Sequence, residues 1–328
     1  MVEKLSKKDM RILAELDKDS RQPDSQIAKK IGLSKQVVNY RINNLVDKGV
    51  ISQFYTTFDI SRMGFNSYYV FIQLEKITST KEKEYMKKLE TLDYVGWLMT
   101  GIGRWDVCLL IYADTLEKFD HHLTQIIELF GDSLHDYNFT MLLKSEHISY
   151  KFVSRSTDSK ILQEENKEKV QLDTTSLALI KALSSNARIS LTDIEKTTRI
   201  PMYVASYRIK AMKKQNLLLG YKVRLDVASM GYEWHLLLLK LQPVSERRKK
   251  EFFSFCENHK NVYYLTRTIG LYNLMVDIHV RSNDEFRQIL QTLRESYPDV
   301  IKIYESIVVF KEHKISYYPE ELTGRNAR

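Results

Sequence analysis

Long apolar runs, cysteines and prolines are scarce in this chain of 328 residues. The densest apolar stretch, residues 234–241, is far shorter than the roughly 20 residues that a membrane-spanning helix needs. The opening segment MVEKLSKKDMR lacks the apolar core of a signal peptide. Cys108 and Cys256 lie in apolar contexts, which is typical of buried thiols in a reducing compartment. We therefore expect a cytoplasmic protein with no disulfide and no membrane partner.

The signals of common enzyme sites are also missing. The sequence has no Gly-rich phosphate loop and no nucleophile elbow. His121 and His122 are adjacent, so on a helix they diverge instead of converging on a metal as residues four apart would. We accordingly predict no catalytic residue, no metal and no cofactor, and a protein that is not an enzyme.

Positive charge, in contrast, is concentrated in two stretches of the chain. The net charge is +8; residues 1–49 hold 11 Lys/Arg against 7 Asp/Glu, and residues 172–216 hold 8 against 3, so the two stretches carry +4 and +5. Clustered positive charge favours an anionic polymer, because each neutralised phosphate releases counterions. A solvated lysine-rich surface is the alternative that charge alone leaves open.

The chain repeats itself at an offset of 167 residues. Identical residues recur at this offset along the whole chain: Tyr40-Arg41-Ile42 matches Tyr207-Arg208-Ile209, Gly103 matches Gly270, Phe119 matches Phe286, and Ile148-Ser149-Tyr150 matches Ile315-Ser316-Tyr317. Identities spread this widely indicate that a whole unit was duplicated. Polar residues 154–171 between the copies predict a linker that could be partly helical.

Each copy changes its periodicity from helical to two-residue alternation. The first 50 residues have the spacing of three helices, at about 5–19, 24–31 and 34–49, the last between Ser34 as N-cap and Gly49 as C-cap. Further along, strands are expected at 68–75, on both sides of 101–104 and at 137–148, with helices at about 80–92 and 115–130. This β-α-β-β-α-β order is the ferredoxin-like pattern.

The predicted fold class is therefore α+β, with two copies of a three-helix helix-turn-helix domain followed by a ferredoxin-like βαββαβ domain. The expected domains are helix-turn-helix 1 over 1–60, αβ domain 1 over 61–153, a linker over 154–171, helix-turn-helix 2 over 172–227, αβ domain 2 over 228–319 and a tail over 320–328.

The third helix of the first copy has the pattern of a DNA-recognition helix. Val38, Ile42 and Leu45 fix its inward face. The opposite face then carries residue types that contact base edges, namely Lys35, Gln36, Asn39, Tyr40 and Asn43. Arg41 lies beside this face and could bind a phosphate or pair with a carboxylate of the first helix. Double-stranded DNA is the expected partner; a scaffold that has lost DNA binding is the alternative.

The segment LSKQVVNYRINNLVDKGVISQF resembles the recognition helix and following strand of the Lrp/AsnC family, the feast/famine regulators. The resemblance covers both copies. It implies transcription regulation, sensing of an amino acid or related metabolite, and dimerisation by sheet pairing. Because both partners lie on one chain, we expect an intramolecular pseudo-dimer with two unlike heads and an asymmetric operator. The resemblance also implies assembly into homo-oligomers.

The second copy departs from the family pattern in its helix-turn-helix. Its turn is Arg199-Ile200-Pro201 where the first copy has Gly32-Leu33-Ser34. The outward positions of its third helix, with the neighbouring arginine, become Tyr203, Ser206, Tyr207, Arg208 and Lys210. We expect the first copy to carry most base readout and the second to bind phosphates or a different half-site. A purely structural second head is the alternative.

One loop of each αβ domain is similar to the ligand-binding Gly-x-aromatic-Asp loop of the family's sensing domain. The residues concerned are Gly101, Gly103, Arg104, Trp105 and Asp106 in the first copy and Gly270, Tyr272 and Asn273 in the second. Glycines let backbone N–H groups approach a carboxylate, and an aspartate can pair with an ammonium group. Asparagine cannot supply that charge, so the first copy is the better candidate. A hairpin turn that binds no ligand is the alternative.

Siroheme decarboxylases share this duplicated architecture and act on a tetrapyrrole, which gives a second hypothesis. His259, Arg267 and the pair Tyr272-Asn273 are side chains that such an enzyme could use. A helix-capping His259 and a sheet-edge Arg267 are the structural alternative. The corresponding segment of the first copy, residues 92–106, has no histidine, so DNA-binding regulation is the primary hypothesis.

Overall fold

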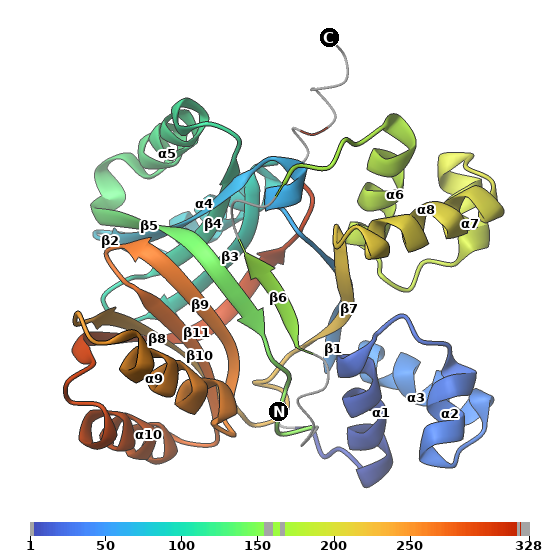
Figure 1. Ribbon diagram of the computed structural model, residues 1–328. Helices are drawn as coiled ribbons and strands as arrows, with labels where there is room; N and C mark the ends of the chain where they lie inside the picture. The colour runs from blue at the N-terminus through green and yellow to red at the C-terminus, as the bar shows by residue number, and fades with distance from the viewer. Residues whose placement is uncertain (1–2, 154–159, 165–167, 320–321, 323–328) are drawn as a thin grey trace.

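The computed structural model describes residues 3–153, 160–164, 168–319 and 322. Two helical heads lie together at one end of the molecule and a β-barrel lies at the other (Figure 1). The first head contains α1 (Lys7–Lys18), α2 (Asp24–Ile31) and α3 (Lys35–Asp47), followed by strand β1 (Ile51–Phe58). The second contains α6 (Thr174–Ser185), α7 (Leu191–Thr198) and α8 (Met202–Lys214), followed by β7 (Leu218–Leu225).

The barrel is built from two equivalent halves of four strands and two helices. The first half consists of β2 (Asn66–Leu74), α4 (Ser79–Thr91), β3 (Val95–Ile102), β4 (Val107–Ala113), α5 (Leu116–Phe130) and β5 (Leu134–His147). The second consists of β8 (Glu233–Leu241), α9 (Glu246–Asn258), β9 (Val262–Gly270), β10 (Leu274–Val280), α10 (Asn283–Ser296) and β11 (Ile301–Ile315). Single turns of 3₁₀ helix cover η1 (Ser61–Met63) and η2 (Gly131–Ser133).

Long strands from each half close the barrel. The strand order is β2-β4-β3-β11-β8-β10-β9-β5, and β5 pairs again with β2. The first part of β5 pairs with β2 and its last part with β9; β11 divides in the same way between β8 and β3. The two ferredoxin-like sheets thus join edge to edge inside one chain, and the pairing of β5 with β2 closes the barrel. The expected intramolecular pseudo-dimer is confirmed.

Side chains alternate between the barrel interior and the helices outside, as successive residues of a strand must. On β4, Leu109 and Ile111 pack outward in the cluster under α4 and α5. Their neighbours Leu110 and Tyr112 belong to the interior cluster instead. Strand β10 repeats the pattern, with Val276 and other outward residues under α9 and α10. The ferredoxin-like fold predicted for each half is confirmed.

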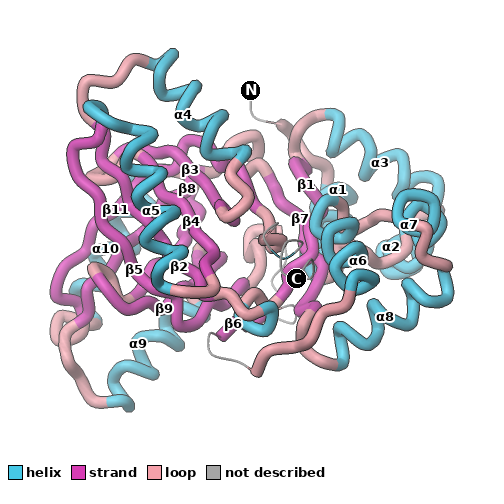
Figure 2. Tube along the Cα trace, turned by 90° about the horizontal axis from the view of Figure 1, so that it is seen from above, coloured by secondary structure: helices cyan, strands magenta, loops and turns pink. Residues whose placement is uncertain are grey.

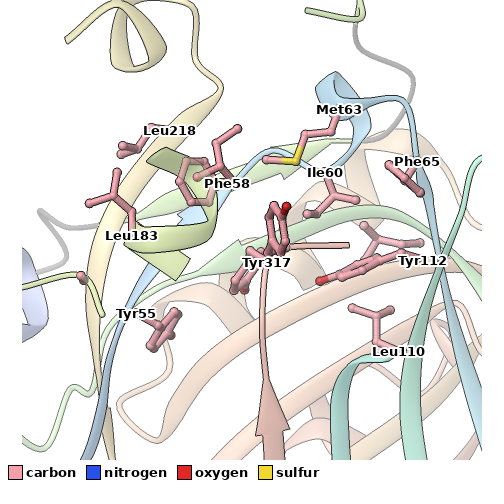
Figure 3. Packing of buried hydrophobic residues seen from close by; sticks show 14 of the residues in the cluster. Tyr55, Phe58, Ile60, Met63, Phe65, Leu110, Tyr112, Leu183, Leu218 and Tyr317 are labelled. Atoms are coloured by element: carbon pink, nitrogen blue, oxygen red, sulfur yellow. The ribbon is translucent and has the colours of Figure 1, made fainter. Parts of the chain in front are cut away.

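A two-stranded ribbon joins the heads to the barrel. Strands β1 and β7 pair antiparallel over their whole length, and Figure 2 shows them between the heads and the barrel. Residues of the ribbon, the second head and the barrel form one continuous interior cluster, in which Figure 3 shows Tyr55, Phe58 and Leu218 of the ribbon beside Tyr112 and Tyr317. The first head packs in a separate cluster with β7 of the ribbon and with Trp234 and Tyr263 of the barrel. The heads are therefore packed against the barrel rather than tethered to it.

The predicted linker contains a strand, so the expectation that it could be partly helical is wrong for its described part. Residues 154–159 and 165–167 lie outside the described residues, but Ile161–Glu164 form β6 and pair with the end of β5. A strand of four residues is too short to show the alternation of apolar and polar residues by which a strand is predicted in a polar segment. The pairing is decided by the free edge of β5. The expected tail lies outside the described residues except for Leu322, which is buried.

The other simple expectations can be compared with the structure directly. Cys108 and Cys256 are both free and buried. Within the described ranges, no helix has the length and apolar character to cross a bilayer. His122 is buried and stacks on Tyr94, whereas His121 is exposed.

Candidate DNA-binding interface

Local sequence fixes the position of α3 in the first head. Gly32 adopts the left-handed conformation, with φ of 72°, that ends α2 and turns the chain. Ser34 then caps α3, its hydroxyl accepting a hydrogen bond from the N–H of Val37 at 3.3 Å. Val38, Ile42 and Leu45 are buried against α1 and α2 in the head's own core. These contacts decide which face of α3 meets solvent.

The outward face of α3 carries the five predicted side chains. Lys35, Gln36, Asn39, Tyr40 and Asn43 are all exposed, and Tyr40 retains 71% of its surface. The Asn39 amide donates to Asp24 at 2.9 Å, and Asn43 donates to Asn39 at 3.3 Å. Amides of this kind can exchange these partners for base edges. The structure thus brings the predicted residues together on one polar surface.

Arg41 pairs with a carboxylate of the first helix, which is one of the two roles that the sequence left open. Its guanidinium lies 2.7 Å from Asp9, which belongs to the capping box at the start of α1. Burial alone would raise the pKa of Asp9, but hydrogen bonds from Ser6 and Arg41 outweigh it and lower that pKa. The pair ties α3 to α1, so Arg41 positions the recognition helix in this structure.

The second head has the same frame with a different surface. Arg199 takes the left-handed position of Gly32, with φ of 59°, a conformation that costs more for a residue with a Cβ. Tyr203 and Tyr207 are 79% and 72% exposed, and Lys210 is also exposed. Ser206 is only half-buried. Arg208 pairs with Asp173 at 2.8 Å, as Arg41 does with Asp9. Aromatic rings and positive charge replace the amides of α3.

The two heads contact one another through equivalent arginines that the sequence analysis did not single out. Arg21 donates to the carbonyl of Ala187, and Arg188 donates to the carbonyl of Ser20 at 2.6 Å. Arg188 also lies 2.5 Å from Asp24, the acceptor of Asn39. The two arginines are 167 positions apart, and only that repeat could have indicated their pairing. They join the two heads, whose helices α3 and α8 lie toward opposite ends of the pair of heads in Figure 2.

The aromatic residues of the two predicted effector loops meet inside the barrel. Trp105 and Tyr272 are buried, and the indole N–H of Trp105 donates to the Tyr272 hydroxyl at 2.7 Å. That hydroxyl donates to Glu305 at 2.5 Å. Phe71 contacts both rings. The aromatic rings are therefore buried, whereas the neighbouring Arg104 is exposed at the surface and pairs with Glu305 at 2.9 Å.

The remaining loop residues have structural partners. A carboxylate oxygen of Asp106 accepts the N–H of Leu74 at 2.7 Å, and the amide oxygen of Asn273 accepts the N–H of Leu241 at 3.0 Å. The two residues therefore hold the ends of equivalent strands, a task that needs an acceptor but no charge.

The three loop glycines lie where the long strands cross. A Cβ at Gly101 or Gly103 would lie 2.5 Å from a carbonyl oxygen of β11, and one at Gly270 would lie 2.8 Å from a carbonyl of β5. These glycines thus permit strand packing. Effector binding at these loops stays a prediction.

Of the side chains named for a tetrapyrrole enzyme, Arg267 and Asn273 line one pocket, whereas His259 lines another and Tyr272 is buried. His259 is the C-cap of α9, which confirms the alternative that it caps a helix. The interpretation of Arg267 as a sheet-edge charge is wrong, because barrel closure pairs β9 on both sides. Its guanidinium lies 4.8 Å from the ring centre of Phe253. In the parts of the chain covered by the structure, no three metal-ligating side chains come together.

Comparisons with known proteins agree with this architecture. Residues 5–52 match the model of a winged helix-turn-helix DNA-binding family. The chain is 31% identical over 118 residues to the HTH-type transcriptional regulator Ptr1 of Methanocaldococcus jannaschii, covering 35% of this chain and 78% of that protein. It is 25% identical over 124 residues to the regulatory protein AsnC of Haemophilus influenzae, covering 38% and 82% of the two chains.

A solved structure matches the duplicated fold from end to end. The siroheme decarboxylase NirDL superposes with a TM-score of 0.62 at 14% identity, covering 98% of this chain and 100% of that one. At this identity the likeness concerns the fold alone. The regulator relatives and the helix-turn-helix match place this chain in the Lrp/AsnC family of transcription regulators.

Proposed function

We propose that this chain is a sequence-specific DNA-binding transcription regulator that carries both halves of an Lrp/AsnC-type dimer. The observation that carries the proposal is the exposed polar face of α3, in a chain that is 31% identical over 118 residues to a helix-turn-helix regulator. Gln36 and Asn39 supply amides suited to adenine, and Lys35 supplies a donor suited to guanine or phosphate. The second head adds Tyr203, Tyr207 and Lys210, which suit backbone contacts and apolar contacts in a groove.

The proposal is tested by measuring affinity for duplex DNA at two salt concentrations. A DNA-binding protein that neutralises several phosphates loses affinity steeply as salt rises, whereas a scaffold without DNA binding shows no such change. Binding sites are selected from genomic fragments at low salt, with bulk competitor DNA present. A regulator enriches particular fragments; recovery of fragments in their original proportions contradicts the proposal.

We further propose that an amino acid or related small metabolite modulates this binding through the loop of the first copy. The support is the position of Arg104 and Asp106, which carry opposite charges at the exposed end of the β3–β4 hairpin. Repeating the fragment selection with and without amino acids tests this. An effector changes the set or the number of enriched fragments, and identical sets contradict this part of the proposal.

Apolar side chains on the barrel support assembly into homo-oligomers. Ile102 and its equivalent Ile269 are 57% and 59% exposed, and Ile303 is 50% exposed. Exposed apolar groups at equivalent places on a pseudo-symmetric barrel are suited to contacts between copies. Analytical ultracentrifugation tests this: a species larger than one chain supports assembly, and a pure 38.7 kDa species contradicts it.

A tetrapyrrole enzyme is the second candidate function, and the whole-chain likeness to NirDL favours it. We propose that the chain is not such an enzyme, because its His259 and Arg267 are held in separate structural contacts. Absorbance titration with iron-uroporphyrin separates the two. A saturable shift of the visible band favours the enzyme, and an unchanged spectrum favours the regulator.

A further inference from the structure

The barrel contains a cavity at the end covered by the β1–β7 ribbon. Its volume is about 90 Å³, several times the space that one water molecule needs. Its walls come from most of the barrel strands and from the ribbon, which contributes Tyr55 and Arg224. Trp97, Trp234, Tyr263 and other inward side chains of the barrel remain partly exposed there. The interior is thus hollow at this end and filled at the end of Trp105 and Tyr272.

Aromatic rings dominate the cavity wall. The lining includes two tryptophans and seven tyrosines: Trp97, Trp234, Tyr55, Tyr69, Tyr112, Tyr150, Tyr263, Tyr264 and Tyr317. Figure 3 shows Tyr55, Tyr112 and Tyr317 gathered at this place, and the rings of Tyr55 and Tyr317 are stacked with centres 6.1 Å apart. Faces of tyrosine and tryptophan attract cations electrostatically, and the attraction grows when the cation is desolvated.

The charged groups of the cavity leave one carboxylate without a cation. Arg224 pairs with Glu312 at 2.5 Å, and Glu312 also accepts the indole N–H of Trp97 at 2.6 Å. Asp277 accepts the indole N–H of Trp234 at 2.8 Å. Across the residues that the structure covers, no lysine or arginine pairs with Asp277, which is only 7% exposed. An ionised Asp277 thus gives the cavity one excess negative charge.

Folding alone does not call for this carboxylate. At the repeat offset Asp277 corresponds to Leu110, an inward side chain of the same cavity. The same comparison pairs Glu312 with Ser145 and His279 with Tyr112. The position of Asp277 therefore accepts an apolar residue in the first copy. At these three positions the second copy places two carboxylates and a histidine near the cavity. Burial without a cation raises the pKa of Asp277 to about 7, which a bound cation would reverse.

We propose that this cavity binds a small organic cation, an amine or quaternary ammonium ion, between the aromatic rings and the carboxylate of Asp277. Such a ligand would supply the missing positive charge and fill the hollow. This site is separate from the β3–β4 loop and does not depend on DNA binding. Because Arg224 and Tyr55 belong to the ribbon that carries both heads, the ligand would touch the connection between barrel and heads.

Isothermal titration calorimetry without DNA tests the proposal. The probes are methylammonium, tetramethylammonium, choline and putrescine, with 3,3-dimethylbutan-1-ol as the uncharged counterpart of choline. We expect at least one cation to bind the full chain, and choline to bind on the order of tenfold more tightly than its uncharged counterpart. Absence of binding by all four cations, or equal binding of choline and the alcohol, overturns the proposal.

Variants locate the site. Asp277→Asn keeps the shape and removes the charge, and we expect it to weaken cation binding by on the order of tenfold or more. Asp284→Asn, on the exposed start of α10, is the matched control and should bind as the unmodified chain does. Trp97→Leu is a second test variant if Asp277→Asn does not fold. It removes one aromatic side chain from the cavity wall and should also weaken binding. Unchanged affinity in the folded Asp277 variant, or in Trp97→Leu where that variant replaces it, overturns the assignment.

Discussion

The two copies of the unit share a backbone and differ in what their corresponding side chains do. Gln36 on the first recognition helix corresponds to Tyr203 on the second, buried Asp17 corresponds to Ser184, and Leu110 corresponds to Asp277. The first copy thus exposes amides on α3 and buries a carboxylate in its head, whereas the second copy places a carboxylate at the barrel cavity. In a homodimer both halves would have to change together. Fusion on one chain lets each position specialise.

The largest expected effect concerns how each head is attached. Lys222 of β7 and Asp17 of α1 are both fully buried; the ammonium group lies 3.8 Å from the carboxylate and donates to the Asp17 carbonyl at 2.9 Å. Lys222→Met leaves the carboxylate buried without its cation, so we expect a loss of about 3–5 kcal/mol in the free energy of unfolding. Urea denaturation measures it.

Two further variants sharpen this difference between the heads. Adding Asp17→Asn to Lys222→Met should recover part of the loss, since the amide still accepts the N–H of Tyr150 without carrying a charge. Ser184→Ala, at the corresponding place in the second head, should change stability little. A loss from Ser184→Ala as large as that from Lys222→Met would contradict the asymmetry.

The second effect is a dependence of stability on pH that comes from Asp277, whose counterpart in the first copy, Leu110, does not titrate. The folded pKa of Asp277, about 7, lies above its ordinary value of 3.8. The folded state therefore holds a proton more tightly, and its contribution is complete below about pH 4 and lost as pH rises toward 7. Asp277→Asn should gain on the order of 3 kcal/mol relative to the unmodified chain over this window.

Urea denaturation of both chains at pH 4 and pH 7 measures this gain. Of the other groups at the cavity, Arg224 and Glu312 are paired, and burial lowers the pKa of His279 to about 3. His279 therefore stays neutral throughout the window. A difference between the two chains that does not change with pH would mean that Asp277 is ionised in the folded protein at both values.

The third effect separates base reading from backbone contact. Gln36→Ala should lower affinity for a selected site by about 1–3 kcal/mol and leave affinity for random duplex nearly unchanged. Tyr203→Ala, at the same place on α8, should lower both affinities by similar smaller amounts, because aromatic contact carries less sequence information. Fluorescence anisotropy with selected and random duplexes measures both. Equal losses on both duplexes for Gln36→Ala would mean that the reading face lies elsewhere.

The smallest effect concerns the contact between the heads. Arg188→Ala removes the bonds to Ser20 and Asp24 and should cost about 1 kcal/mol of stability. Arg21→Ala removes the bond to the Ala187 carbonyl and should cost less. Arg188→Ala should also weaken binding to the selected site more, because Asp24 orients Asn39. Identical binding losses in the two variants would contradict a special role for Arg188.

Helical spacing, capping residues and the internal repeat predicted most of the fold from the sequence. Helical spacing, Ser34 and Gly32 defined α2 and the start of α3, because caps and left-handed turns have strong local preferences. The predicted C-cap Gly49 was wrong, since α3 ends at Asp47 with Lys48 as its C-cap and Gly49 follows in the left-handed conformation. The repeat predicted one pseudo-dimer. Barrel closure, β6 and the arginine contacts between heads depend on segments far apart in the chain, which no local pattern encodes. Trp105 illustrates the limit: its loop is visible in the sequence, but its burial against Tyr272 is not.

The central claim is that the outward face of α3 reads base edges on one side of an asymmetric site. DNA footprinting on a selected fragment, with the unmodified chain and with Gln36→Ala, tests it most directly. We predict an asymmetric footprint whose protection is weakened by Gln36→Ala in one half only. A strictly palindromic footprint weakened equally in both halves, or protection that does not respond to Gln36→Ala at all, would contradict it.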